Sequence, residues 1–278
     1  HPDRDETWAE TEKSRIGEER FRREHECEFL IFDETLISSV VLADMEGVTP
    51  IENTGQVRWF KRPTPGNTYL TSLDPSMGTG GDYAAIQVFE LPTFEQVAEW
   101  HHNQTPMNQQ VRILQGINKH IHDTIMEKDS SATPQIFYSM ENNSIGEAAL
   151  MAIQDQGEEN IKGLFVSEPI RRGHVRKFRK GFNTTHKSKI SACSKFKEYI
   201  ENDKMTIHSK NLISELKTFV AAGNSFSAKP GEHDDLVSAT LLICRMVGVV
   251  ASWDQKLYQR LKENTEEEVA PMPIFVVT

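Results

Sequence analysis

Short apolar segments and long amphipathic segments alternate along this chain in an order that restricts its fold. Three strand-like segments come first, and they read YLTSLD at 69–74, YAAIQVFE at 83–90 and QVAEWH at 96–101. The segment at 105–127 then repeats apolar residues at helical spacing. Because strands joined by a hairpin pair antiparallel, whereas strands joined through a helix pair parallel, this order predicts a mixed sheet.

The chain beyond this helix continues the alternation. Further strands are expected at 135–141, 163–167 and 205–208, and further helices at 144–153, 190–200, 212–220 and 233–251. Ser144, followed three residues later by Glu147, predicts a capping box at the start of one helix. The last helix, HDDLVSATLLICRMVGVVA, is largely apolar and is expected to be buried. The predicted fold class is therefore α/β, a ribonuclease H-like mixed sheet flanked by helices.

A break in the pattern at KRPTPGN, residues 61–67, suggests two regions. Residues 1–66 are interpreted as a connecting region that packs partly on the rest of the chain. This region includes a charge-alternating helix near Arg15–Glu26 and a strand-like EFLIF at 28–32. Residues 67–278 are interpreted as the main domain, which ends in a tail with four acids within Glu263–Glu268.

The composition excludes several classes of protein. The chain has 278 residues, of which 37% are hydrophobic, and this supports a sizeable core rather than collagen or wholesale disorder. No uninterrupted apolar run approaches roughly 18 residues, so no membrane partner is expected. The net charge is −10, so a general affinity for nucleic acid is not expected from the sum of charges.

One stretch departs from this acidic balance. Between Arg171 and Lys189 the chain carries eight cations and no acid. Because one sign of charge collects at one place, this stretch is predicted to bind the phosphates of DNA, and the alternative is a solvated basic loop. The candidate DNA-binding residues are Arg171, Arg172, Arg176, Lys177, Arg179, Lys180 and Lys187.

Four acids stand at the ends of predicted elements. Asp74 ends the first strand of the main domain, Glu141 ends the fourth, and Asp234 and Asp235 open the last helix. If the first and fourth strands are parallel neighbours, their carboxyl ends lie roughly 5 Å apart, and the helix can bring its acids to the same point. Each acid also has an ordinary reading, as a turn residue, a strand-end charge or a helix-dipole partner.

Clustered carboxylates repel one another, and a divalent cation removes that cost. Oxygen ligands suit Mg²⁺, or Mn²⁺, so Asp74, Glu141 and Asp235 are the expected metal ligands. Two such ions would activate a water and stabilise the leaving oxygen of a phosphodiester, which makes all four acids candidate catalytic residues. Asp82 and His233 are candidates for supporting these ligands, although Asp82 also begins the next strand and His233 could simply be exposed.

The glycine-rich turn at Gly78–Asp82 follows a strand, as phosphate-binding turns do. However, the chain contains no GxxxxGK[ST] motif, so the turn is a weak nucleotide signal. Its glycines could instead let DNA or metal approach Asp74 closely. A sugar-kinase-like phosphotransferase is the alternative that this turn leaves open.

Four segments together resemble a known family. SLDPSMGTGGDYAAIQVFE, YSMENNSIGEAAL, RKFRKGFNTTHKSKISACSKFKEYIENDKM and GEHDDLVSATLLI are similar to the C-terminal nuclease domain of the large terminase subunit of tailed phages, and most similar to the T-even type. The resemblance covers about residues 28–250. It implies a Mg²⁺-dependent endonuclease that cuts concatemeric double-stranded viral DNA during packaging.

The same resemblance implies the setting of the reaction. The expected partners are double-stranded DNA, an N-terminal ATPase domain that would precede residue 1, the portal and the small terminase subunit. The expected place is the host cytoplasm, at the portal vertex of the procapsid. Two alternatives share this fold or setting, namely a Holliday-junction resolvase or integrase-type nuclease, and a DNA-gripping module without catalysis.

Overall fold

The computed structural model describes residues 6–17, 21, 25, 34–172, 175–178, 180–253 and 261. Several sequence predictions lie outside this part of the chain: most of the helix near Arg15–Glu26, the strand at 28–32, Arg179 and the acids of Glu263–Glu268.

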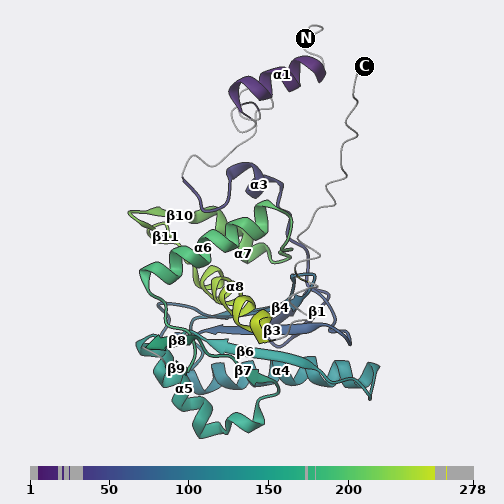
Figure 1. The fold of residues 1–278 in the computed structure, drawn as a ribbon, viewed down its shortest axis with the longest axis vertical. Helices are drawn as coiled ribbons and strands as arrows, with labels where there is room; N and C mark the ends of the chain where they lie inside the picture. Colours follow the sequence, from purple (N-terminus) through teal and green to yellow (C-terminus); the bar gives the residue numbers. More distant parts are fainter. Residues whose placement is uncertain are drawn as a thin grey trace.

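A seven-stranded sheet forms the centre of the fold, in the order β1-β2-β5-β4-β3-β6-β7 (Figure 1). Its strands are β1 (Glu52–Thr54), β2 (Val57–Trp59), β3 (Thr68–Asp74), β4 (Ala84–Leu91), β5 (Glu95–His102), β6 (Gln135–Met140) and β7 (Leu164–Phe165). β3 pairs antiparallel with β4 and parallel with β6. The predicted α/β fold class, with a mixed sheet, is confirmed.

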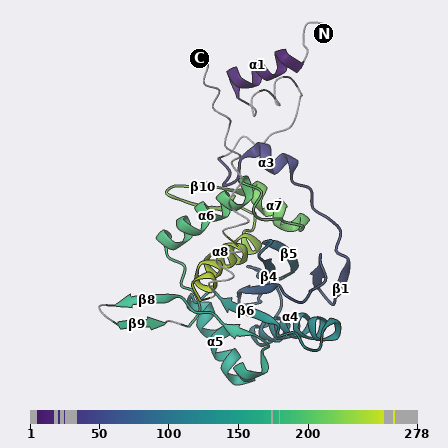
Figure 2. The same ribbon diagram turned by 45° about the vertical axis from the view of Figure 1, so that its right-hand side comes forward.

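Helices cover both faces of this sheet. The helices are α1 (Glu6–Ile16), α3 (Ser39–Asp44), α4 (Met107–Lys128), α5 (Ser144–Gln156), α6 (His186–Glu201), α7 (Lys210–Thr218) and α8 (Asp235–Trp253), with a 3₁₀ turn at Glu158–Asn160. One core joins α6, α7 and α8 to the sheet, and a second core joins α4 and α5 to its opposite face (Figures 1 and 2).

Strand alternation decides which helix each β3 residue meets. Leu70 lies in the α8 core, whereas Tyr69 and Leu73 lie in the α4 core. Ser72 also faces α8, because its hydroxyl donates to the Ala239 carbonyl at 2.7 Å. Asp74 is two residues further along β3, so it is turned toward α8 as well.

The structure differs from the sequence predictions at several short elements. The basic stretch forms a hairpin of β8 (Pro169–Arg172) and β9 (Val175–Phe178). The last residues of the helix predicted at 212–220 instead begin a second hairpin, of β10 (Phe219–Ala222) and β11 (Ser225–Ala228). The segment 205–208 makes one bridge, from Thr206 to Glu95, and is not a strand. β1 and β2 belong to the predicted connecting region, yet they extend the sheet beside β5.

The apolar sequence of α8 is accounted for by its buried position. By length and composition alone, this 19-residue helix could cross a membrane, but 61% of its most apolar stretch is buried inside the protein. It lies between the sheet and the helices α6 and α7 (Figure 1). The prediction of a buried core helix is therefore confirmed.

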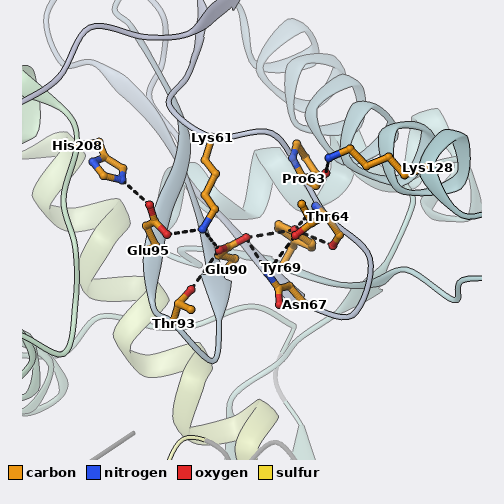
Figure 3. A network of polar contacts seen from close by, with 10 residues as sticks. All are labelled: Lys61, Pro63, Thr64, Asn67, Tyr69, Glu90, Thr93, Glu95, Lys128 and His208. Atoms are coloured by element: carbon orange, nitrogen blue, oxygen red, sulfur yellow. Dashed lines mark hydrogen bonds and ion pairs between the residues drawn. The ribbon is translucent and has the colours of Figure 1, made fainter.

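A buried polar network fixes the end of the sheet opposite Asp74 (Figure 3). Glu90, at the end of β4, is fully buried and accepts from Lys61, Asn67 and Tyr69. Lys61 also contacts Glu95, which accepts from His208 Nε2 at 2.9 Å. Burial disfavours charge on Lys61, but these two carboxylates outweigh it and raise the pKa of Lys61.

Replacing Lys61 by methionine is expected to destabilise the fold by about 3 kcal/mol, at the lower end of the cost of breaking a buried ion pair, because the fully buried Glu90 loses its cation. Lys61 is 32% exposed, which is why the lower end applies. The midpoint of urea unfolding measures the change. The control is Lys128→Met, which removes a bond from Lys128 to a neutral group, the Pro63 carbonyl, and should cost about 1 kcal/mol. Equal losses in both variants would contradict the importance of the network.

Candidate active site

Two carboxylates meet at the carboxyl ends of neighbouring parallel strands. Asp74 ends β3, and Glu141 directly follows β6, where its backbone N–H donates to the Leu73 carbonyl at 3.1 Å. Their side chains are hydrogen-bonded to each other. Burial raises the pKa of Asp74 well above its usual range, and the neighbouring charge of Glu141 raises it further. A nearby negative charge disfavours the charged form of a carboxyl group, so Glu141 makes ionisation of Asp74 less favourable.

The residues after Glu141 hold its side chain in place. Asn143 donates from Nδ2 to Glu141 Oε2 at 3.0 Å, and its Oδ1 accepts from the backbone N–H groups of Ile145 and Gly146. Asn143 is therefore the N-cap of α5, and the predicted capping box at Ser144 is wrong. A Cβ on Gly146 would lie 2.0 Å from the Glu141 carbonyl oxygen, so only glycine permits this close approach.

The two acids at the start of α8 differ in their surroundings. Asp234 accepts from the Ala228 backbone N–H at 3.3 Å and lies 3.7 Å from Lys189 Nζ. Asp235 Oδ2 is buried and has no hydrogen-bond partner among the described residues. Both charges raise the pKa of Asp74, and Asp235 has the larger effect of the two. The fold thus brings all four predicted acids together at one place.

The cluster of acids is not arranged as a formed metal site. Within the described ranges, no group of three His, Cys, Asp or Glu side chains has the geometry to hold an ion. The cause is visible in the contacts, since Asp74 and Glu141 bond to each other and Asp234 turns to Lys189. The donor set nevertheless fits a hard divalent cation, because Asp74, Glu141 and Asp235 all offer carboxylate oxygens.

A pocket of about 200 Å³ opens beside Asp74 and Glu141. Its other lining residues are Thr184, Lys189, Ala192, Ser238, Leu241, Leu242 and Arg245. The acids and the two cations therefore face the same small space. A site of mixed charge of this kind can hold a phosphate group next to a bound cation.

The sequence reading did not single out Lys189 or Arg245 as pocket residues. Arg245 reaches from α8 to Glu168 at 2.9 Å and to the Asn183 carbonyl at 3.0 Å, and its guanidinium lies over the Phe182 ring. These contacts tie α8 to the segment that follows the basic hairpin. Lys189 belongs to the basic stretch, but only its position on α6 shows that it reaches the acids.

Glu215 on α7 is a further acid that the sequence reading missed. Burial raises the pKa of Glu215 to about 9, and the charges of Asp235 and Asp234 act in the same direction. Its Oε2 accepts from the Val237 backbone N–H at 3.0 Å, which opposes the shift. Glu215 therefore holds the first turn of α8 from a neighbouring helix, near the acids but not in the pocket.

The two predicted supporting residues lie in different places. His233 is 46% exposed, and its Nδ1 lies 3.6 Å from Asp235 Oδ2. Asp82 is exposed in the loop between β3 and β4. This loop is anchored by Gln110 of α4, which bonds both the N–H and the carbonyl of Ser76.

The basic hairpin begins close to the acids and projects from the domain (Figure 2). Phe182, just after the hairpin, makes a parallel bridge with Glu141, and the Asn142 side chain donates to the Lys180 carbonyl at 2.7 Å. Arg171, Arg172, Arg176 and Lys177 are placed on β8 and β9 by their backbone. Lys180 pairs with Glu158 at 3.3 Å, and Lys187 is exposed at the start of α6.

Comparison with solved structures identifies the fold. The chain is similar to the large terminase nuclease of the thermophilic phage G20c, solved with bound magnesium, with 18% identity and a TM-score of 0.55 over 77% of this chain and 97% of that chain. The same nuclease solved with bound cobalt matches with 17% identity and a TM-score of 0.55, over 77% and 97% of the two chains. The large terminase nuclease domain of Thermus phage P74-26 matches with 18% identity and a TM-score of 0.51, over 73% and 92%.

Sequence identities this low establish only the fold. The family to which the chain belongs is shown by a match to a sequence-family model. The family model described as the terminase RNaseH-like domain matches residues 71–246, which is more than half of the chain and includes all four acids. This chain therefore belongs to the terminase RNaseH-like domain family.

Proposed function

We propose that this chain is the nuclease domain of a large terminase subunit of the T-even type. It acts as a Mg²⁺-dependent endodeoxyribonuclease that cuts concatemeric double-stranded viral DNA with low sequence specificity. The observation that carries this proposal is the meeting of Asp74, Glu141 and Asp235 from three separate elements, with the pKa of Asp74 raised by its neighbours.

Asp74, Glu141 and Asp235 are the residues that would hold the divalent cation, with Asp234 beside them. One or two Mg²⁺ or Mn²⁺ ions, when bound, supply Lewis-acid stabilisation of the phosphate and a more acidic water. A bound cation would compensate the charges of Asp74 and Glu141 and so remove the repulsion between them. The magnesium and cobalt complexes of the G20c nuclease support the use of divalent cations by this fold.

The basic residues act on the DNA backbone. Lys189 and Arg245 face the pocket of the acids and would hold the phosphate that is cut. The residues of β8 and β9, with Lys187, would bind neighbouring phosphates. Phosphate contacts fix position without reading bases, so they suit an enzyme with little sequence preference. Asp82 and His233 are proposed to support the ligands from the rim of the site.

The wider assembly follows from family membership and the motif similarity. Residues 1–66 are proposed to connect this domain to an N-terminal ATPase and to pack partly on it, and 67–278 to form the nuclease. β1 and β2 support the partial packing, because both strands belong to the sheet. The proposed partners are the portal and the small terminase subunit, at the portal vertex in the host cytoplasm.

The test is plasmid cleavage with and without metal. Supercoiled plasmid in Mg²⁺ should become nicked and then linear, EDTA should stop the reaction, and added Mg²⁺ should restore it. Cutting that continues in excess EDTA, or no cutting in Mg²⁺ or Mn²⁺, would contradict the proposal. A branched DNA junction in the same assay distinguishes the proposed nuclease from a resolvase, since a resolvase would cut the junction in preference to linear DNA.

A further inference from the structure

His101 lies in the same row of the sheet as Asp74. Asp74 of β3 pairs with Ala85 of β4, and Ala85 pairs with His101 of β5. Directly paired residues of antiparallel strands point to the same face of a sheet. His101 therefore faces α8, as Asp74 does, from two strands away. Ala85 between them is fully buried and carries only a methyl group, which leaves room above it for the first turn of α8.

Asp235 occupies the space between the two ends of this row. On one side lies the end of β3 with Asp74, since the Ser72 hydroxyl of β3 donates to the Ala239 carbonyl one turn along α8 from Asp235. On the other side its Oδ2 lies 4.0 Å from His101 Nε2 and 3.6 Å from His233 Nδ1. Because Oδ2 faces the two imidazoles, they restrict the direction in which the other oxygen of Asp235, Oδ1, points.

Three buried polar atoms face one another here without a hydrogen-bond partner among the described residues. They are His101 Nε2, Glu215 Oε1 and Asp235 Oδ2. His101 Nε2 lies 3.8 Å from Glu215 Oε1, so the imidazole stands between the two carboxyl groups. Unpartnered buried polar atoms are rare in native proteins, and three that converge indicate a polar contact with a function.

Neighbouring side chains restrict the movement of this imidazole. The Tyr83 ring stacks on the His101 ring with centroids 4.1 Å apart, and its edge meets the His233 ring at 4.8 Å. Glu215 is fixed independently through the Val237 backbone N–H at 3.0 Å. The His101 ring is thus held beside Asp235, with Nε2 4.0 Å from Asp235 Oδ2.

We propose that His101, with Glu215, is a positioning residue for the cleavage reaction, which holds Asp235 through Oδ2 and so presents Oδ1 to the cation. This inference rests on the proposed nuclease function. It assigns to His101 a role through Asp235 and not a direct contact with the scissile phosphate. Partners that orient a ligand in this way affect metal affinity by about 10- to 100-fold when they are removed.

The test compares two amide variants with a matched histidine elsewhere. Glutamine places its amide nitrogen near the position of imidazole Nε2, whereas the shorter asparagine reaches only the position of Nδ1. Binding of Mn²⁺ is measured by electron paramagnetic resonance, independently of cleavage. We expect His101→Gln to bind Mn²⁺ nearly as the parent does, and His101→Asn to bind about 10-fold or more weakly.

The control is His120→Asn. His120 packs on Trp59 in a tilted arrangement with ring centroids 4.3 Å apart, so it also contacts an aromatic ring, but it belongs to α4 on the opposite face of the sheet. This variant should change the melting temperature without changing Mn²⁺ affinity. Equal Mn²⁺ affinities of folded His101→Gln and His101→Asn would overturn the role of His101. A parent protein that neither binds Mn²⁺ nor cuts plasmid would instead overturn the proposed function.

Discussion

Asp74→Asn is expected to reduce DNA cleavage by about 10³-fold or more while the fold persists, because losing one member of a catalytic constellation removes most of its effect. Asparagine has nearly the shape of aspartate but carries no charge, so the proposed cation loses the ligand that lies between Glu141 and Asp235. The rate of plasmid nicking in Mg²⁺ measures the loss, and circular dichroism checks the fold.

The same substitution should stabilise the metal-free protein at neutral pH. The pKa of Asp74 is raised in the folded state, so the unfolded chain ionises first as pH rises above the ordinary carboxyl value of about 4. From that pH upward, the parent loses stability that the neutral asparagine keeps. The melting temperature of Asp74→Asn in EDTA should therefore exceed that of the parent at pH 7 and approach it below pH 4.

Asp123→Asn is the matched control for both measurements. Asp123 is exposed on α4, where it pairs with Lys119 one turn away. Its loss should leave the nicking rate unchanged. Parent-like cutting by a folded Asp74→Asn protein would remove Asp74 from the reaction.

Neutralising Arg176, Lys177, Arg179 and Lys180 together should weaken DNA binding and flatten its dependence on salt. Each lost phosphate contact lowers the slope of log affinity against log salt concentration by about 0.9, so four lost contacts lower it by up to about 3.6. The slope is measured by fluorescence anisotropy on a DNA duplex across a series of salt concentrations. Three of these residues lie on or directly after the hairpin, and Arg179 lies outside the described residues.

A double variant of Arg112 and Lys119 provides the comparison. Both cations lie on α4, on the face of the sheet opposite the acids, so their removal should leave the slope nearly unchanged. If the quadruple variant kept the parent slope, the basic stretch would be a solvated hairpin and not a DNA-binding element.

The sequence could predict the framework because strong local patterns and simple pairing rules agree there. Two hairpin-linked strands and one amphipathic helix separate the apolar segments at 69–74 and 135–141, and the helix returns the chain so that the second segment can run parallel to the first. Asp74 and Glu141 meet because these two strands are parallel neighbours, which was a condition of the prediction. The approximate position of Asp234 and Asp235 could also be predicted, because the long apolar helix that they begin must be buried against the same sheet.

The parts that depend on register could not be predicted in this way. The pairing of β4 with β5 shifts between Val88 and Phe89, and this irregularity decides that His101 shares a row with Asp74. Nothing in the alternation of residues shows such a shift beforehand. Glu215 reaches α8 through a contact between helices, which no local pattern encodes.

The predictions of short elements were wrong for a different reason. The basic stretch forms the two strands β8 and β9 although it lacks the usual apolar alternation. The cap of α5 is Asn143, one residue before Ser144, because the Asn143 side chain accepts from the backbone N–H groups of Ile145 and Gly146. Phe219 and Val220 continue the apolar pattern of α7 but turn into β10. In these cases tertiary contacts outweigh a weak local preference.

Anomalous diffraction from crystals soaked in Mn²⁺ tests the central claim most directly, because it locates the cation without relying on cleavage. The predicted result is a strong peak within bonding distance of Asp74 and of Glu141 or Asp235, which is absent from Asp74→Asn crystals soaked in the same way. A peak bound elsewhere, or no peak at these carboxylates in a protein that cuts DNA in Mn²⁺, would contradict the assignment of this cluster as the cutting centre.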